Sequence, residues 1–172
     1  MPRIAPALVA LLALSLSACA SVQRLDAAND VHALLVAIRD DDQAQFDAHV
    51  DRPALQREVE ARMNTEIQKR AAKDDRVAAL GALLGPSLAK FAGEALIQPS
   101  TFRAVAEYYG STPEQKIPGP VAIAGALKPL DDGRVCATRK KNGPCLLVFT
   151  KEGEAWKLTS FEGDTSMLRL KG

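Results

Sequence analysis

The chain has few of the residues that metal sites and nucleic-acid platforms require. Its 172 residues include two histidines and three cysteines, and aromatic residues make up only 5% of the whole. So few aromatic residues argue against the stacking surfaces that bind single-stranded nucleic acids. The formal net charge is +1, so composition gives no electrostatic argument for nucleic acid or for an anionic surface as a partner.

Recognisable catalytic motifs are also absent from the sequence. It contains no serine-centred glycine elbow, no glycine-rich phosphate loop and no pair of histidines at metal-ligand spacing. His32 and His49 fall in helical segments and are expected at the surface or edge of the fold. The 21 acidic residues offer no pair that stands out as a general acid and base. We therefore expect no cofactor and no metal.

The first 18 residues have the three parts of a bacterial export signal. Arg3 supplies the basic start, residues 4–16 form an apolar run, and two small residues precede the cleavage point. The run is shorter than the roughly 20 apolar residues of a membrane span. Residues 16–19 (LSAC) resemble the lipobox of bacterial lipoproteins, in which the cysteine, here Cys19, is acylated and begins the mature chain. The alternative is an ordinary secretory signal with an incidental cysteine.

The residue after Cys19 indicates which membrane holds the protein. Ala20 stands where Asp would commonly cause inner-membrane retention, so resemblance to enterobacterial sorting favours the outer membrane. Residues 19–25 are predicted to be a short tether, which reaches at most about 20 Å when extended. We therefore expect a periplasm-facing domain of the cell envelope that its lipid holds close to the membrane.

Cys136 and Cys145 remain as a pair once Cys19 is assigned to lipid. The segment between them, ATRKKNGP, is typical of a hairpin turn, and cysteines that flank such a turn can face each other. The exported compartment permits disulfides. The sequence therefore favours a disulfide, with free thiols as the alternative. A zinc site would need two further ligands, and both histidines are far away.

Residues 26–109 carry helical periodicity. Apolar residues at helical spacing predict a helix over 26–38, and the aspartates at 40–42 end it and start the next. That triplet lacks the spaced ligands of a calcium loop. Asp51 and Pro53 mark the start of a third helix. Its predicted buried stripe is Leu55, Val59, Met63 and Ile67.

The apolar stretch 77–97 resembles a membrane helix but is not predicted to be one. Its eight strongly apolar residues contribute roughly −2.5 to −5 kcal/mol, whereas Lys90 and Glu94 together cost about +5 to +7 kcal/mol. Pro86 also interrupts the middle of the stretch. The expected elements are buried helices over 77–84 and 87–97 and a short helix over 99–109.

The pattern changes after 110–120, a connector rich in proline and glycine. Candidate strands, separated by turn signals, cover 121–127, 134–138, 146–151, 155–161 and 165–170. This spacing suits antiparallel hairpins. A sheet this small cannot bury both faces alone. We therefore expect one α+β domain over 26–172, with the N-terminal helices (26–109) packed on one face of a C-terminal antiparallel sheet (121–172).

Three stretches of the chain have a recognisable arrangement. In ALLVAIRDDDQAQFDAHVDRPALQREV an amphipathic helix, an acidic break, a Val-Asp-x-Pro-Ala-Leu turn and a charged helix follow in order. ALIQPSTFRAV comes next, and a terminal strand carries GEAWKL. Over residues 31–158 the chain thus resembles the domain of unknown function 2939 family of bacterial proteins, from which it departs at Gln56, where that family has a basic residue. The resemblance implies no known activity.

Two classes of function remain. The first is a non-catalytic binding or interaction module for an envelope protein or an apolar ligand, and the lack of catalytic motifs favours it. The second is a periplasmic hydrolase whose residues meet only in three dimensions.

The sequence also suggests where a binding site would lie. A curved sheet backed by helices resembles the cone-like folds that hold small molecules. Val121, Ile123 and Leu127 alternate with alanines, which predicts one bulky and one small-sided sheet face. A binding site for an apolar ligand would therefore lie between helices and sheet, with Tyr108 or Tyr109 at its rim. The alternative is that the helices simply fill this space.

Overall fold

The computed structural model describes residues 5–73, 84–85, 87, 90–91, 93–108, 110–112, 114–138 and 143–162, with backbone alone before residue 21. The helices are α1 (Ala5–Asp40), α2 (Gln43–Ala48), α3 (Arg52–Ala71), α5 (Pro99–Tyr108) and α6 (Pro120–Ala126). The strands are β1 (Leu127–Pro129), β2 (Val135–Thr138), β3 (Cys145–Glu152) and β4 (Ala155–Phe161). Helices thus precede a C-terminal sheet, which confirms the α+β prediction.

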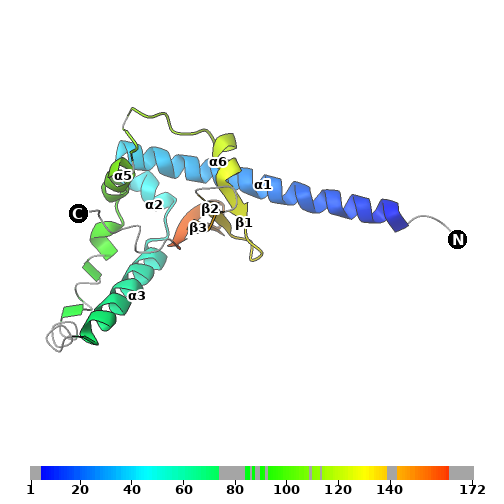
Figure 1. Cartoon of the computed structure of the whole chain (residues 1–172). Coiled ribbons are helices and arrows are strands. Elements are labelled where there is room, and N and C mark those ends of the chain that lie inside the picture. The colour runs from blue at the N-terminus through cyan, green and yellow to red at the C-terminus, as the bar shows by residue number, and fades with distance from the viewer. Residues whose placement is uncertain are drawn as a thin grey trace.

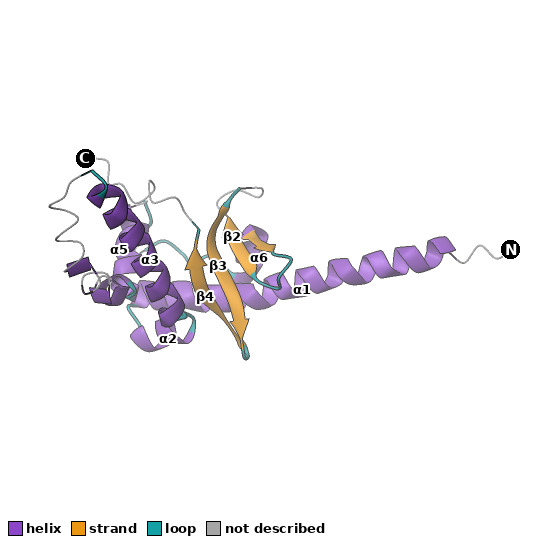
Figure 2. Ribbon diagram, turned by 90° about the horizontal axis from the view of Figure 1, so that it is seen from below, coloured by secondary structure: helices purple, strands orange, loops and turns teal. Residues whose placement is uncertain are grey.

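The four strands form one antiparallel sheet in the order β1-β2-β3-β4 (Figure 2). In the predicted hairpin of β2 and β3, Cys136 lies opposite Val148 and Thr138 opposite Cys145. Cys136 and Cys145 form a disulfide across it, with their Cα atoms 5.5 Å apart. The predicted disulfide is therefore confirmed.

α1 crosses one face of the sheet and contacts both edge strands, β1 and β4 (Figure 2). Ala27 and Ala28 are fully buried on its inner side, and such small side chains let the helix approach the strands closely. The larger side chains of this core include Leu34, Phe46, Leu55, Ile97, Ile123, Leu127, Val135, Phe149, Trp156 and Leu158. The main core thus lies between the helices and one face of the sheet.

Aspartates start the second and third helices as the sequence predicts. The side chain of Asp42 accepts a hydrogen bond from the Gln45 amide at 3.0 Å, and that of Asp51 from the Ala54 amide, also at 3.0 Å. Each thereby satisfies an amide that has no partner within the first helical turn. In α3 the predicted stripe is buried only in its first half, at Leu55 and Val59.

The outer edge of β4 is closed by two other segments, the α2–α3 junction and α3. The Leu158 amide donates to the carbonyl of His49 at 2.9 Å, and its carbonyl accepts from the Asp51 amide at 3.0 Å. Further along, the Phe161 amide donates to Glu58 Oε2 at 3.0 Å, and Arg62 donates to the Phe161 carbonyl. Backbone groups paired in this way cannot accept an added strand.

The prediction of a strand over 121–127 is wrong, because Pro120–Ala126 is the helix α6. Gly119 precedes it and Pro120 occupies its first turn, where the missing N–H of proline does no harm. The alternating alanines are strong helix formers. Ile123 is buried, but Val121 is 81% exposed, so the two do not share a sheet face.

The predicted tether over 19–25 is also helical, because α1 runs without interruption from Ala5 to Asp40 (Figure 1). No proline or glycine occurs between residues 7 and 40 to end the helix. Within the described part of the chain, no helix is both long and apolar enough to span a bilayer. The strand predicted over 165–170 lies outside the described residues, as does all but Leu84 of the helix predicted over 77–84.

Candidate functional site: a groove between α1 and α5

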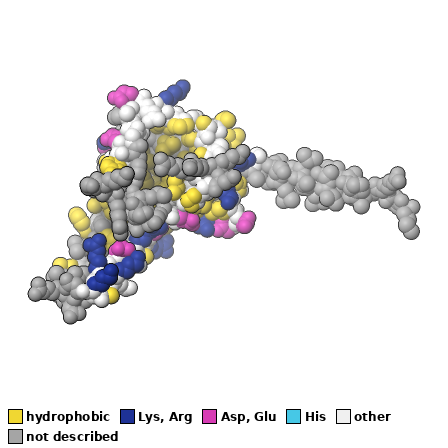
Figure 3. Space-filling view, viewed as in Figure 1, with side chains coloured by type: hydrophobic (Ala, Val, Ile, Leu, Met, Phe, Trp, Pro, Cys, Tyr) yellow, Lys and Arg dark blue, Asp and Glu magenta, His cyan; other side chains and the backbone are white. Residues whose placement is uncertain are grey.

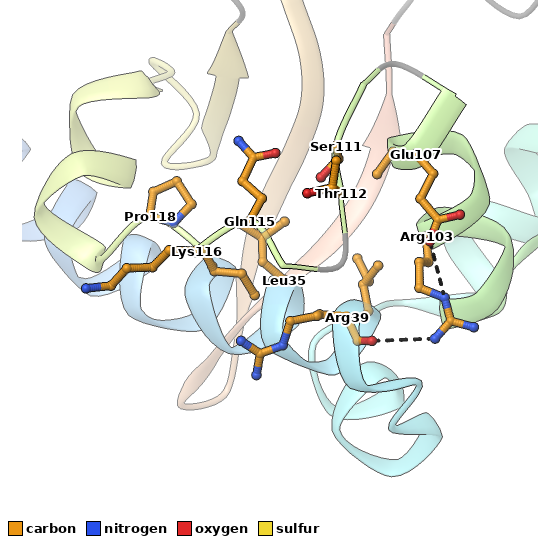
Figure 4. Close-up of a pocket in the computed structure, with 12 residues that line it drawn as sticks. Leu35, Arg39, Arg103, Glu107, Ser111, Thr112, Gln115, Lys116 and Pro118 are labelled. Atoms are coloured by element: carbon orange, nitrogen blue, oxygen red, sulfur yellow. Dashed lines mark hydrogen bonds and ion pairs between the residues drawn. The ribbon is translucent and has the colours of Figure 1, made fainter.

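A groove of about 160 Å³ lies where α1, α5 and the α5–α6 connector (residues 110–119) meet (Figure 4). We call it the α1–α5 groove. Its lining residues are Leu35, Ile38 and Arg39 of α1, Arg103, Ala106 and Glu107 of α5, and Ser111, Thr112, Gln115, Lys116, Ile117 and Pro118 of the connector. Aliphatic side chains therefore lie beside guanidinium, hydroxyl and amide groups.

Packing and hydrogen bonds fix the two sides of the groove. Phe102 of α5 packs edge-on against Phe46 of α2, with ring centroids 5.4 Å apart, which places α5 beside the end of α1. His32 Nδ1 donates to the carbonyl of Pro118 at 2.9 Å and holds the end of the connector on α1. His32 therefore has a structural partner, in keeping with its predicted place at the edge of the fold.

The two arginines of the groove differ in how firmly they are held. Arg39 donates to both oxygens of Asp40, at 2.7 and 2.9 Å, and these hydrogen bonds lower the pKa of the Asp40 carboxyl. Arg103 lies 3.4 Å from the Arg39 carbonyl, 3.6 Å from Asp41 and 3.9 Å from Glu107. All three distances exceed those of a charge-assisted hydrogen bond, about 2.7 to 2.9 Å. Arg103 is thus held by longer contacts than Arg39.

The groove combines charged side chains with apolar walls. Three cationic side chains, Arg39, Arg103 and Lys116, line it with one carboxylate, Glu107. Figure 4 places Leu35 and Pro118 beside these charged groups. Apolar walls with a few polar groups are typical of small-molecule sites. Among the described residues, no group of three His, Cys, Asp or Glu side chains is placed to hold a metal ion.

A second polar cluster joins α1 to the start of β4. Asp26 Oδ2 accepts from Lys151 Nζ at 2.7 Å and from Trp156 Nε1 at 2.9 Å. Asp30 accepts from the Trp156 amide at 2.8 Å, and its other oxygen lies 3.5 Å from His49 Nδ1. Since these carboxylates receive hydrogen bonds from the sheet, we assign the cluster to the stability of the fold.

The groove does not lie between the helices and the sheet, where the sequence predicts a pocket. Tyr108, the predicted rim residue, is exposed at the end of α5 and is not among the lining residues. Tyr109, the other one, lies outside the described residues. The prediction depended on a sheet face at 121–127, of which residues 121–126 are helical. The backbone of Cys19 lies in α1, and its side chain is not described.

Sequence reasoning missed Arg39 and Arg103. The two residues are 64 positions apart, and each looks like an ordinary basic residue on its own helix. The one local signal was the spacing of Arg103 and Glu107, four positions apart on α5.

Comparison with known proteins gave one match. No curated protein and no solved structure matches the chain. The family described as "Protein of unknown function (DUF2939)" matches residues 7–105. This segment covers more than half of the chain and includes α1 from its third residue, α2, α3 and all but the last turn of α5. The chain therefore belongs to this family of proteins of unknown function.

Proposed function

We propose that this chain is a lipid-anchored protein of the bacterial cell envelope whose α1–α5 groove binds a small ligand that combines an apolar part with an anionic group. It acts as a non-catalytic binding module that faces the periplasm, with the outer membrane favoured by Ala20. No observation on the described residues favours the alternative of a hydrolase. An envelope protein as partner stays a prediction from the sequence.

The loose engagement of Arg103 is the observation that carries the ligand proposal. Its guanidinium has no partner among the described residues closer than 3.4 Å. A planar guanidinium presents paired donors that match a carboxylate. A bound carboxylate therefore gives the Arg103 guanidinium short hydrogen bonds in place of its present long contacts. The hydroxyls of Ser111 and Thr112 supply further donors on the connector side of the groove.

The size of the groove limits the ligand. Its volume is about 160 Å³, and a cavity of about 150 Å³ accommodates benzene. The ligand part inside the groove is thus about as large as a six-carbon chain. Leu35, Ile38 and Ile117 supply the apolar contacts for it.

The anchor part of the proposal depends on the sequence of residues 1–19. A basic residue, an apolar run too short to span a bilayer, and LSAC follow in the order of a lipoprotein signal. Under this proposal the mature chain begins at Cys19, and its lipid holds the domain on the membrane.

Thermal unfolding with hexanoate as the probe tests the ligand proposal. We expect hexanoate to raise the melting temperature, because a ligand that binds only the folded state stabilises it. Hexanol has the same chain without the charge, and hexylammonium has the opposite charge, so neither should reproduce the shift. Arg103→Gln should abolish it.

The matched control is Arg57→Gln on α3. Arg57 is exposed, lies outside the groove and donates to the Pro53 carbonyl of its own helix, so its variant should keep the hexanoate shift. An equal shift with hexanol, or an unchanged shift in Arg103→Gln, would contradict the proposed role of Arg103.

A further inference from the structure

The side of α1 that points away from the core carries no charge over four helical turns. Val22 is 68% exposed and Leu25 is 44% exposed, and Asn29 is exposed as well. Ala33 and Val36 continue the line and are half-buried. Spacings of three, four, four and three residues keep all five on one side of a helix. We call them the outer stripe of α1.

The acidic residues within this part of α1 point toward the sheet. Asp26 binds Lys151 and Trp156, and Asp30 binds the Trp156 amide. Gln23 Nε2 also donates to the carbonyl of Gly133, in the turn between β1 and β2, at 2.7 Å. Residues 23–30 are therefore fixed on the domain, and both carboxylates bind groups of the sheet, with the Asp26 carboxylate still partly exposed.

The absence of charge from the outer stripe differs from the outward side of an ordinary surface helix. A helix on the surface of a soluble domain places its charged residues outward, whereas a helix that is apolar on both sides is covered on both. The core covers the inner side of α1. Figure 3 shows hydrophobic side chains gathered over α6, which packs beside α1. The outer stripe thus calls for an apolar cover.

We propose that the outer stripe of α1 lies against the lipid bilayer and holds the domain in one orientation on the membrane. The inference depends on the proposed lipid anchor at Cys19, which lies on the same helix only three residues before Val22. The helix continues from Cys19 into the docked residues without a break, so the anchor places the stripe at the bilayer surface. The uncharged stripe contacts neutral and anionic lipid equally.

This orientation sets the position of the α1–α5 groove. Its α1 residues, Leu35 to Arg39, follow Cys19 by 16 to 20 residues, which is about 24 to 30 Å along the helix axis. Leu35 and Ile38 pack against the core and so belong to the inner side of α1. The groove therefore opens away from the bilayer, toward the periplasm.

Quenching by brominated lipid tests this orientation. The full lipid-modified chain is placed in vesicles of dioleoylphosphatidylcholine, with or without bromine on the acyl chains, as wild type and as Leu25→Trp. The wild type has one tryptophan, Trp156, which is buried and provides the background. We expect the emission added by Leu25→Trp to be lost in brominated vesicles. The matched control is Val105→Trp on α5, where Val105 is 42% exposed, and its emission should persist.

The results of this experiment distinguish a failure of the proposed orientation from a failure of the proposed lipid anchor. A wild-type chain that sediments with vesicles, together with Leu25→Trp emission that bromine leaves unchanged, overturns the orientation and leaves the anchor in place. Equal quenching at Leu25→Trp and Val105→Trp also overturns it. A Leu25→Trp spectrum that depends on protein concentration in lipid-free Cys19→Ser protein assigns the stripe to a second copy and overturns the proposal. A wild-type chain that does not sediment with vesicles overturns both.

Discussion

One carboxylate oxygen of Asp26 links the first helix to the sheet. It receives hydrogen bonds from a lysine ammonium and from the indole of the buried Trp156. The hydrogen bond from Lys151 contributes most, and that from Trp156 contributes next, to lowering the pKa of the Asp26 carboxyl below 3.8. The free energy of unfolding therefore depends on pH through the Asp26 carboxyl.

We predict that the stabilisation by Asp26 disappears in acid. Because its pKa is lower in the folded chain, the unfolded chain binds more protons and stability rises with pH in this range. The contribution is complete above the unfolded pKa, about 4, and is lost as pH falls through the lower folded pKa. Asp26→Asn should reduce the free energy of unfolding by about 1 kcal/mol at neutral pH, since the pair is partly exposed.

Urea unfolding followed by Trp156 fluorescence measures this effect. The difference between wild type and Asp26→Asn should shrink from neutral pH to pH values below the folded pKa. Asp131→Asn, in the exposed turn after β1, is the control and should match the wild type throughout. A difference between wild type and Asp26→Asn that stays constant over the whole pH range would refute this account.

The Cys136–Cys145 disulfide closes a short loop, since the two cysteines are nine positions apart in the sequence. The chain-entropy relation gives about 2 to 3 kcal/mol for a loop of this length. We predict that the double variant Cys136→Ser/Cys145→Ser loses about this much unfolding free energy in urea. Alkylation of unreduced, denatured wild-type protein should leave both thiols unlabelled. Full labelling of both would show that the bond does not form in the native compartment.

At the scale of elements, α6 is where structure and sequence pattern disagree most. The segment VAIAGA alternates bulky and small residues as a strand does, yet alanine also favours a helix. A proline in the first turn and packing against α1 decide in favour of the helix.

Gly125 offers a direct test of α6. A Cβ at this position would meet no neighbouring atom, and the residue is helical. We predict that Gly125→Ala raises the free energy of unfolding by about 0.5 to 1 kcal/mol through helix propensity. Gly133→Ala is the opposite control and should destabilise, because Gly133 has a φ of +84°. A neutral or destabilising Gly125→Ala would contradict the helix.

Elements with local signals were predictable from the sequence, and the groove was not. Asp42 and Asp51 cap the helices that they start, and each accepts from the amide three residues further on. The hairpin of β2 and β3 and its disulfide likewise depend on one short segment. The α1–α5 groove brings Arg39 beside Arg103, and their approach depends on how α5 packs against Phe46 and α1. No local pattern contains that information.

At the scale of the whole molecule, the two proposals assign different sides of α1 to the membrane and to the ligand. α1 extends away from the body at its N-terminal end, and α5 and α2 lie at its other end (Figure 1). We infer that Cys19 and the outer stripe of α1 face the membrane and that the groove faces the periplasm. This arrangement requires a lipid on Cys19, because that lipid is what brings the outer stripe of α1 to the bilayer.

Mass spectrometry of the N-terminal peptide from the membrane fraction tests this requirement most directly. We predict that the mature chain begins at Cys19, that this residue carries two or three acyl chains, and that Cys19→Ala protein no longer sediments with membranes. A processed wild-type chain with an unmodified Cys19 would contradict the account.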